Sequence, residues 1–250
     1  GYEFRQIGAY FQKLKIDKTD PKCFDYAEKN QSEIFRYCRY NDVGSNETIA
    51  IIGDSHAAAA YPGLSKVVEG LGKNTVLMGG GDLHNNRWKI SKDILKSIVL
   101  KKDIKTVFFS TRGVYHINGT EPYGYSKNPN EMSNHEELSA YDSFFQNTQD
   151  SINALASAGK KVYYITENPE LNKNPKSCLT RVGFLKLDAN KCQPLKQEVL
   201  SRQYEYTKRV KKLSNASIIN VIDIFCPENQ CQVLKDNQLL YSDDDHLSIY

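Results

Sequence analysis

No stretch of this 250-residue sequence approaches the roughly 20 consecutive apolar residues that a transmembrane helix needs. No secretory signal peptide is recognisable at its start either. The chain opens with Gly-Tyr-Glu-Phe rather than with an initiator methionine, which fits either a mature product or a piece of a longer protein. We therefore expect these residues to fold without a membrane span of their own.

The sequence also lacks an excess of charge of either sign. It contains 33 basic and 30 acidic residues, which gives a formal net charge of +3. Nucleic-acid-binding proteins usually show a strong basic patch, so this balance predicts no nucleic-acid partner. The densest basic run, residues 207–213, is expected to be the solvated face of a helix.

A third missing feature is the Cys-x-x-Cys pair that is typical of zinc sites. The six cysteines are even in number, which favours disulfides over free thiols. Because short loops lose the least entropy on closing, we expect neighbours in the sequence to pair. The predicted disulfides are Cys23–Cys38, Cys178–Cys192 and Cys226–Cys231. Disulfides indicate an oxidising compartment, such as a periplasm or a secretory lumen.

Short apolar runs alternate with stretches of helical periodicity from residue 48 onward. The hydrophobic content of 40% is enough for one large domain with a sizeable core. Strands are expected at residues 48–52, 74–78, 105–110, 160–167 and 217–223. Helices are expected at residues 56–72, 91–102, 137–159 and 195–213. This alternation predicts an α/β fold in which helices cover both faces of a parallel sheet.

The first 45 residues differ from the rest of the chain. They are rich in charged and aromatic residues and show no clear strand. We therefore expect an N-terminal extension, residues 1–45, ahead of a catalytic domain, residues 46–250. Phe24, Phe35 and Tyr37 are candidates for packing this extension onto the domain.

A serine follows the first predicted strand, in the run Gly-Asp-Ser-His at residues 53–56. Ligands of parallel sheets bind beyond the carboxyl ends of the strands. Free N–H groups at the start of a helix also stabilise developing negative charge there. Ser55 is therefore the candidate nucleophile, and it needs a base within hydrogen-bond reach. His56 is a poor candidate, because adjacent side chains point in different directions.

A histidine near the C-terminus, His246, is the better candidate base, because the chain returns there to the same edge of the sheet. Asp243 lies three residues earlier, one helical turn away, and is placed to bind the Nδ1 atom of His246. Such a carboxylate fixes the tautomer and stabilises the imidazolium. Asp244 and Asp245 are expected to be solvated neighbours. Taken alone, this run also fits an acidic helix N-terminus, and its pairing with Gly-Asp-Ser favours the catalytic interpretation.

Gly-Asp-Ser-His after the first strand and Asp-x-x-His near the C-terminus resemble the first and last sequence blocks of the SGNH hydrolases. With the runs Gly-Asp-Ser-His-Ala and Tyr-Ser-Asp-Asp-Asp-His-Leu-Ser and the paired cysteines, residues 47–250 resemble the SGNH domains fused to acyltransferase-3 membrane proteins. The resemblance implies a flavodoxin-like three-layer α/β/α fold with a five-stranded parallel sheet. It also implies a catalytic triad of Ser55, His246 and Asp243.

The same resemblance implies a biological setting. Domains of this kind are periplasmic parts of bacterial inner-membrane proteins that O-acetylate lipopolysaccharide O-antigen or a similar surface polysaccharide. The implied partners are an N-terminal acyltransferase-3 membrane domain of the same chain and a polysaccharide acceptor. The membrane domain would deliver the acetyl group, so no cofactor and no metal are expected in this domain.

The middle sequence blocks match the family less closely. For the oxyanion hole we expect the amides of Ser55 and Gly81, which directly precedes Asp82 in the glycine-rich turn after the second strand. Where the family offers Gly-x-Asn-Asp, this chain has Ser-Thr-Arg-Gly, residues 110–113, so Arg112 is the candidate substitute. Losing one oxyanion donor typically costs about 10²–10³ in rate, so we expect a weak esterase when the domain stands alone.

Three other interpretations remain open. A carbohydrate acetylesterase would use the same triad with water as the acceptor. A metal-dependent phosphoesterase would use Asp54, His56, Asp243 and His246 as ligands. A polysaccharide-binding module would carry the same residues as a decayed triad.

The long loop expected at residues 112–136 is the last feature of note, because long loops in compact domains are more often functional than accidental. Tyr115, Tyr123 and Tyr125 fit stacking on sugar faces and ordinary loop packing equally well. The remaining loop histidines are expected to be polar surface residues; they are His84, His116 and His135.

Overall fold

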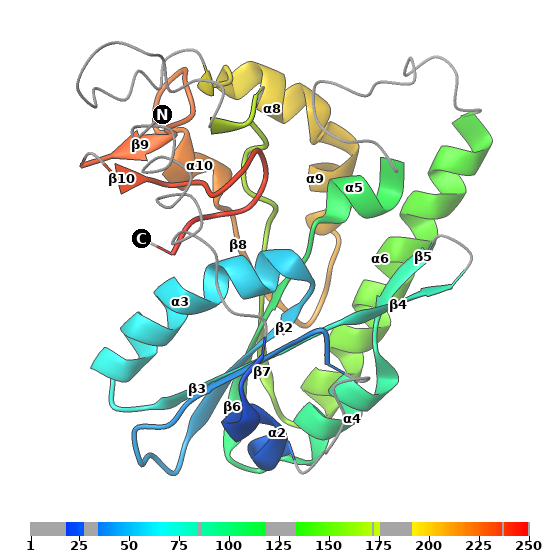
Figure 1. Ribbon diagram of the computed structural model, residues 1–250. Coiled ribbons are helices and arrows are strands. Elements are labelled where there is room, and N and C mark those ends of the chain that lie inside the picture. The colour runs from blue at the N-terminus through cyan, green and yellow to red at the C-terminus, as the bar shows by residue number, and fades with distance from the viewer. Residues whose placement is uncertain are drawn as a thin grey trace.

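The computed structural model has a six-stranded sheet at its centre, in the order β1-β3-β2-β6-β7-β8 (Figure 1). It describes residues 19–27, 35–84, 87–118, 134–171, 173–175, 192–236 and 238–249. The strands are β1 (Tyr37–Asn41), β2 (Thr48–Gly53), β3 (Asn74–Gly79), β6 (Ile104–Ser110), β7 (Lys161–Ile165) and β8 (Ser217–Ile219). Strands β2, β3, β6, β7 and β8 run parallel and correspond to the five strands expected from the sequence. Their order is that of flavodoxin-like sheets.

The sixth strand corrects two expectations, a five-stranded parallel sheet and an N-terminal segment without a strand. Strand β1 pairs antiparallel with β3, from Tyr37 opposite Gly79 to Asn41 opposite Thr75. Its sequence, Tyr-Cys-Arg-Tyr-Asn, has little apolar character. The segment becomes a strand because the edge of β3 offers it a hydrogen-bonding partner, a contact that local sequence does not reveal.

Helices cover both faces of the sheet (Figure 1). They are α2 (Pro21–Ala27), α3 (Ser55–Gly70), α4 (Lys92–Leu100), α5 (Gly113–Asn118), α6 (Asn134–Ser157), α8 (Lys196–Arg202), α9 (Tyr204–Val210) and α10 (Ile222–Phe225). Two small hairpins are added outside the main sheet: β4 (Gly81–His84) with β5 (Arg87–Ile90), and β9 (Leu234–Lys235) with β10 (Gln238–Leu239). No helix in the described part of the chain is both long and apolar enough to cross a membrane.

Strand β2 shows how the sequence creates two cores. All six of its residues are buried, and successive side chains of a strand point to opposite faces. Ala50 and Ile52 join the larger core, which α4, α6 and α9 cover. Ile51 joins a smaller core under α3, where it packs with Ala58 and Tyr61. A strand buried on both faces is continuously apolar, which is why this run was recognisable in the sequence.

The N-terminal segment packs onto the domain through the aromatic residues that we expected. Phe35 is buried in the larger core and Phe24 is half-buried against it. Tyr37 belongs to the smaller core under α3. A disulfide between Cys23 and Cys38 joins α2 to β1, as predicted. The described part of the segment is therefore integrated into the sheet.

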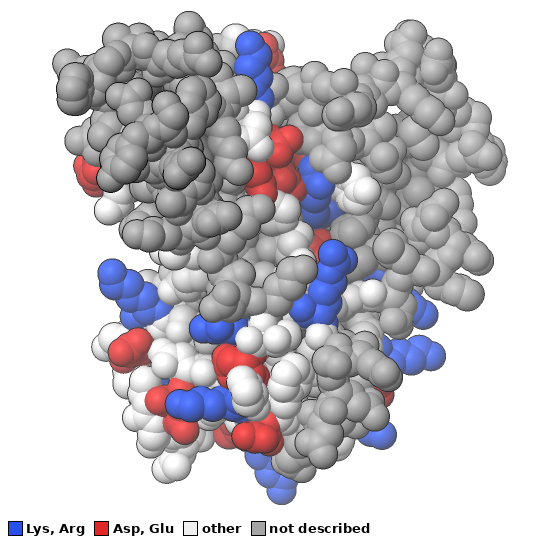
Figure 2. Space-filling model, in the orientation of Figure 1, with Lys and Arg blue, Asp and Glu red and all other residues white. Residues whose placement is uncertain are grey.

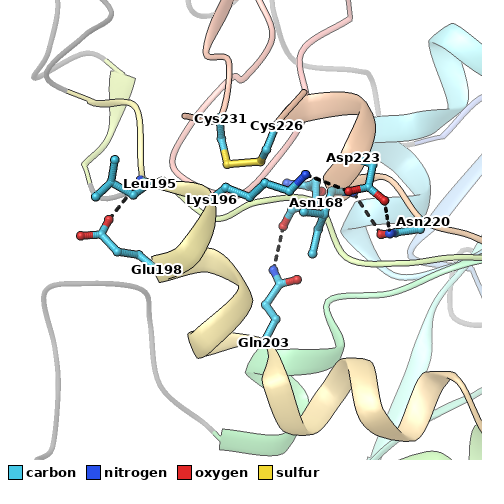
Figure 3. Close-up of a disulfide and its surroundings, with 10 residues drawn as sticks. Asn168, Leu195, Lys196, Glu198, Gln203, Asn220, Asp223, Cys226 and Cys231 are labelled. Atoms are coloured by element: carbon cyan, nitrogen blue, oxygen red, sulfur yellow. Dashed lines mark hydrogen bonds and ion pairs between the residues drawn. A yellow bond between two sulfur atoms is a disulfide. The ribbon is translucent and has the colours of Figure 1, made fainter. Parts of the chain in front are cut away.

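The predicted disulfide between Cys226 and Cys231 is also present, at the end of α10 (Figure 3). Beside it, the Nζ atom of Lys196 on α8 lies 2.9 Å from the Oδ1 atom of Asp223 on α10. Cys192 is disulfide-bonded as well, but its expected partner, Cys178, lies outside the described residues. No free cysteine is found in the part of the chain that the structure describes.

Several element boundaries differ from expectation. The helix expected at 195–213 is broken at Gln203, whose buried side chain donates to the carbonyl of Asn168 at 3.1 Å instead of facing solvent. The loop expected at 112–136 contains α5 and the start of α6. The strand expected at 217–223 ends at residue 219, and α10 begins three residues later.

Candidate functional site

The candidate site lies at the carboxyl ends of β2 and β6, which are adjacent: Gly53 at the end of β2 pairs with Ser110 at the end of β6. The chain leaves β2 for β3 on one side and later returns to β6 on the other. Ligands of open α/β sheets bind at such a switch point. Ser55 follows β2 and Arg112 follows β6, so two of the predicted residues meet here.

Asp54 fixes the turn that carries Ser55. Its Oδ1 atom accepts a hydrogen bond from the backbone N–H of His56 at 2.9 Å and caps α3. Its Oδ2 atom accepts one from the backbone N–H of Arg112, also at 2.9 Å. One carboxylate therefore ties the turns after β2 and β6 together. Because both of its oxygens accept backbone N–H groups, Asp54 is poorly placed to be the metal ligand of the phosphoesterase interpretation.

Ser55 is the first residue of α3 and is half-buried. Burial raises the pKa of Tyr37 on β1, and the hydroxyl of Ser55 is among the groups that lower it by hydrogen bonding. The side chain of Ser55 therefore lies near that of Tyr37. Ser55 stands at the N-terminus of α3, which is the placement expected of a nucleophile that uses the free N–H groups at the start of a helix.

The predicted acid–histidine pair forms in the C-terminal loop. The Nδ1 atom of His246 lies 2.9 Å from the Oδ1 atom of Asp243. That oxygen also accepts the backbone N–H of His246 at 2.8 Å and that of Asp245 at 3.3 Å. The loop is a series of bends rather than the helical turn that we expected. With Nδ1 engaged by a carboxylate, Nε2 is the ring atom available for proton transfer.

The loop places His246 next to the start of α3. The ring of His246 lies 5.2 Å from the ring of His56, between centroids. In the described residues no hydrogen bond joins Ser55 to His246. Catalytic hydrogen bonds are often long in unliganded enzymes and shorten when substrate binds. The structure thus brings Asp243 and His246 into contact and places them near Ser55.

Asp245 corrects the expectation of a solvated neighbour. It is only 4% exposed. Its Oδ1 atom lies 3.0 Å from the Nδ1 atom of His246. Its Oδ2 atom lies 3.3 Å from the Nε2 atom of His56 and 2.8 Å from the Nε atom of Arg112. Asp245 is therefore the residue of the Asp-Asp-Asp-His run that connects the histidine to the rest of the site.

The guanidinium of Arg112 was expected to serve as an oxyanion donor, but carboxylates contact it in the structure. Its guanidinium contacts Asp245, and its Nη2 atom lies 3.5 Å from the Oε1 atom of Glu170, a buried residue that also pairs with Arg202. Its Cζ atom lies 4.6 Å from the centre of the Tyr115 ring. In this arrangement the side chain of Arg112 stabilises buried carboxylates.

Gly81 lies at the start of the hairpin that follows β3. The amide of the preceding residue, Gly80, donates to the carbonyl of Gly53 at 2.9 Å, so it is part of the sheet edge. Gly81 is exposed and is the first residue beyond this bond. Gly81 therefore follows the carboxyl end of β3, beside the end of β2, where the oxyanion donor was expected.

Other candidates fall partly or wholly outside the description. Tyr115 packs on Arg112, whereas Tyr123 and Tyr125 lie outside the described residues. The same holds for the side chains of three histidines: His84, His116 and His135.

The electrostatics of the site centre on His246. Burial would lower the pKa of His246, but hydrogen bonds to Asp243 and Asp245 outweigh burial and raise this pKa from 6.5 to about 10. For Asp245, burial would raise the pKa, and hydrogen bonds to His246 and His56 lower it well below its usual range. The resting site therefore holds a protonated His246 between two carboxylates at neutral pH.

A second buried acid, Glu167, lies below the site. Burial raises its pKa well above the usual value, and the neighbouring Glu170 adds to the effect. Its Oε2 atom accepts the backbone N–H of Val114 at 2.7 Å, and its own N–H donates to Tyr206 at 3.2 Å. Glu167 thereby holds the first turn of α5, next to Arg112, in place.

Two overlapping clusters in the described residues have the composition of a metal site, and one of them is the run of three acids at residues 243–245. In the other, ligand atoms of His56, Asp245 and His246 lie within 4.8 Å of one another. A guanidinium already occupies the cationic position, however, because Arg112 contacts the Asp245 oxygen that faces His56. The Nδ1 atom of His246 also lies between two carboxylates. These contacts favour a hydrogen-bonded site over a metal centre.

Comparison with known proteins gives the family. A family model described as "SGNH domain (fused to AT3 domains)" matches residues 22–250. The chain belongs to this family. The match begins within α2, so the SGNH domain includes α2 and β1. Fusion to acyltransferase-3 domains associates this SGNH domain with acyl transfer and with a membrane-protein context.

Other comparisons add little. No curated protein matches this SGNH domain. Among solved structures, it is similar to a PLP-bound C-S lyase from Staphylococcus hominis, with 10% identity and a TM-score of 0.33. The match covers 88% of this chain and 50% of the lyase chain. A likeness at this level carries no functional information.

Proposed function

We propose that this SGNH domain transfers acetyl groups to hydroxyls of lipopolysaccharide O-antigen or a similar surface polysaccharide, on the periplasmic side of the membrane. The observation that supports it most directly is the 2.9 Å contact between Asp243 and His246, beside the start of the helix that carries Ser55. This pair has the polarity and the spacing of the acid–base half of a serine triad.

In the proposed mechanism, the Oγ atom of Ser55 attacks the carbonyl of the acyl donor while the Nε2 atom of His246, in the neutral form of its ring, takes the hydroxyl proton. The bond to the leaving group breaks, and His246 returns the proton to that group. A sugar hydroxyl then attacks the acetyl-Ser55 ester and gives its proton to His246. The Ser55–acetyl bond breaks, and the proton returns to Ser55.

The negative charge of each tetrahedral intermediate needs donors. The backbone N–H groups of Ser55 and Gly81 are the candidates, since the guanidinium of Arg112 contacts Asp245 and Glu170. Arg112 would then contribute by holding the site together rather than by binding the oxyanion. With few donors, formation and breakdown of the acetyl-Ser55 ester would both be slow, so the domain standing alone would be a weak hydrolase.

The test is turnover of p-nitrophenyl acetate by the purified domain. Ser55→Ala and His246→Gln should each reduce kcat at least about 10³-fold, because triad members act as a unit. Ser217→Ala, at an exposed position on β8, is the matched control and should keep full activity. Melting temperatures of all variants should agree within a few degrees.

The outcomes separate the alternatives. Wild-type turnover by Ser55→Ala would reject the triad. Inhibition by a chelator but not by a sulfonyl fluoride would favour a metal-dependent phosphoesterase. Acetate as the sole product in the presence of oligosaccharide acceptors would favour a carbohydrate acetylesterase. Oligosaccharide binding without any turnover would favour a binding module.

A further inference from the structure

Asp245 contacts two imidazoles that approach from distant parts of the chain. His56 belongs to the first turn of α3, and His246 belongs to the C-terminal loop. Each of the two oxygens of Asp245 faces a different ring: Oδ1 lies 3.0 Å from His246 and Oδ2 lies 3.3 Å from His56. The side chains of both Asp245 and His56 are at most 5% exposed. This contact therefore joins α3 to the C-terminal loop with little access for water.

His56 links this contact to the candidate nucleophile, because the two residues are adjacent in the sequence. His56 directly follows Ser55, and its backbone N–H is fixed by Asp54 at 2.9 Å. A carboxylate that holds the His56 ring therefore also holds the turn that presents the nucleophile. The same carboxylate contacts the candidate base, so it sets the separation between Ser55 and His246.

The backbone of Asp245 is anchored independently of its side chain. Its carbonyl accepts a hydrogen bond from the side chain of Asn168 at 2.8 Å. The guanidinium of Arg112 lies 2.8 Å from Oδ2 and compensates the buried negative charge. Asp245 is thus fixed from three elements: α3, the turn after β6 and the segment after β7.

The two carboxylates at His246 differ in kind. The Oδ1 atom of Asp243 also accepts two backbone N–H groups, and the Asp243 side chain is 22% exposed. The Asp245 side chain is 5% exposed and makes its contacts with side chains. Asp243 therefore shapes its own turn, whereas Asp245 connects that turn to the nucleophile.

We propose that Asp245 is a positioning residue that holds His246 opposite Ser55 through His56, so that the orienting function is shared between Asp243 and Asp245. The proposal rests on the triad of the proposed function. It adds a residue to the site and assigns a role to the histidine of Gly-Asp-Ser-His.

The test replaces Asp245 by asparagine, which keeps size and shape. We expect kcat for p-nitrophenyl acetate to fall about 10²-fold with little change in KM, because misplacing a catalytic group by about 1 Å costs that much. Asp244→Asn is the matched control, since it removes the same charge from the same loop, whereas the carboxylates that contact the His246 ring among the described residues are those of Asp243 and Asp245. It should stay within about twofold of wild type.

The pH profile provides a readout that a purely structural role would not change. His246 must be neutral to act as a base, and its pKa is raised to about 10, so kcat/KM should increase with pH up to that region. The charged groups facing this pair are Asp243 and Arg112, with Glu170 behind Arg112, and the titratable ring of His56 also faces it. Asp245→Asn should move the inflection to lower pH, because it removes a negative charge that stabilises the imidazolium.

Variants at His56 test the contact between Asp245 and His56 from the side of α3. His56→Gln keeps a terminal N–H near the place of Nε2 and should retain most of the activity, whereas His56→Leu should resemble Asp245→Asn. The losses from His56→Leu and Asp245→Asn should not add in the double variant, because they break the same contact. Fully additive losses would overturn the proposal.

The same experiments separate this proposal from the proposed function. Titration of the ring of His246 by NMR needs no turnover and can be done in a Ser55→Ala background. A lower His246 pKa in Asp245→Asn than in Asp244→Asn supports the proposed contact of Asp245 with His246, even if the wild type proves inactive on acetyl esters. An unchanged His246 pKa together with unchanged kcat in Asp245→Asn rejects it.

Discussion

Gly53 shows how one residue places the nucleophile. It ends β2 with a φ of +146°, in a region that residues with a side chain rarely adopt. A Cβ atom at this position would lie 1.7 Å from the carbonyl oxygen of Ser110 on β6. Only glycine lets β2 and β6 stay paired to their ends while the chain turns into α3. The turn at Gly53 thus brings Ser55 to the edge of the sheet.

Gly53→Ala is therefore expected to destabilise the domain by about 3 kcal/mol or more, from backbone strain combined with overpacking. The measurement is the free energy of unfolding from urea denaturation. Gly63→Ala, inside α3, is the matched control, since a Cβ atom there meets nothing within 4 Å. It should stabilise the domain by about 0.5–1 kcal/mol, because alanine favours the helix. Equal stability of the two variants would contradict this view of Gly53.

At the scale of elements, the C-terminal loop depends on its neighbours for its position. Figure 3 shows the side chain of Gln203 pointing toward Asn168. The side chain of Gln203 donates to the carbonyl of Asn168, and the side chain of Asn168 donates to the carbonyl of Asp245. The break between α8 and α9 therefore contributes to the geometry of the site.

The two fully described disulfides should differ in what they stabilise. Cys23–Cys38 closes a separation of 15 residues and Cys226–Cys231 one of 5. From chain entropy, removing the first by a double Cys→Ala change should cost about 3 kcal/mol and removing the second about 2 kcal/mol. Melting temperatures should fall by about 6–12 °C and about 4–8 °C, respectively. A larger loss for the shorter loop would contradict the entropic explanation.

At the scale of the whole molecule, charges of both signs are mixed on the described part of the face in Figure 2. On the face in Figure 2, acidic and basic side chains lie next to one another, both in the upper middle and across the lower part. The family is defined by fusion to acyltransferase-3 domains, which gives this domain a membrane-protein context. Helix α2 and strand β1 are joined by the Cys23–Cys38 disulfide, so these two elements belong to the folded domain.

Tethering raises the effective concentration of donor and acceptor without tight intrinsic binding. We therefore expect polysaccharide O-acetylation in cells to need the membrane portion and this domain on one chain. The measurement is the acetyl content of the polysaccharide in cells that lack the enzyme and express the joined, the separated or the Ser55→Ala form. Full acetylation by the membrane portion alone would show that this domain is dispensable for transfer.

Much of the fold was readable from local patterns. The parallel strands were predictable because each is a short apolar run that ends near a glycine or a polar turn, as in Thr48–Gly53. Strand β1 was not, because it is a strand only while the edge of β3 is beside it. The break at Gln203 was not either, because its cause is the carbonyl of Asn168, 35 residues away in the sequence.

The candidate site likewise has residues that local sequence predicted and one contact that it did not. The sequence by itself determined Ser55 as a candidate nucleophile and the three-residue spacing of Asp243 and His246, because a glycine turn and a short spacing are local properties. Only the tertiary structure decided which of the three consecutive acids is buried. Asp245 turns inward because it contacts His56. The two residues are 189 positions apart in the chain, and no local pattern encodes a contact at that separation.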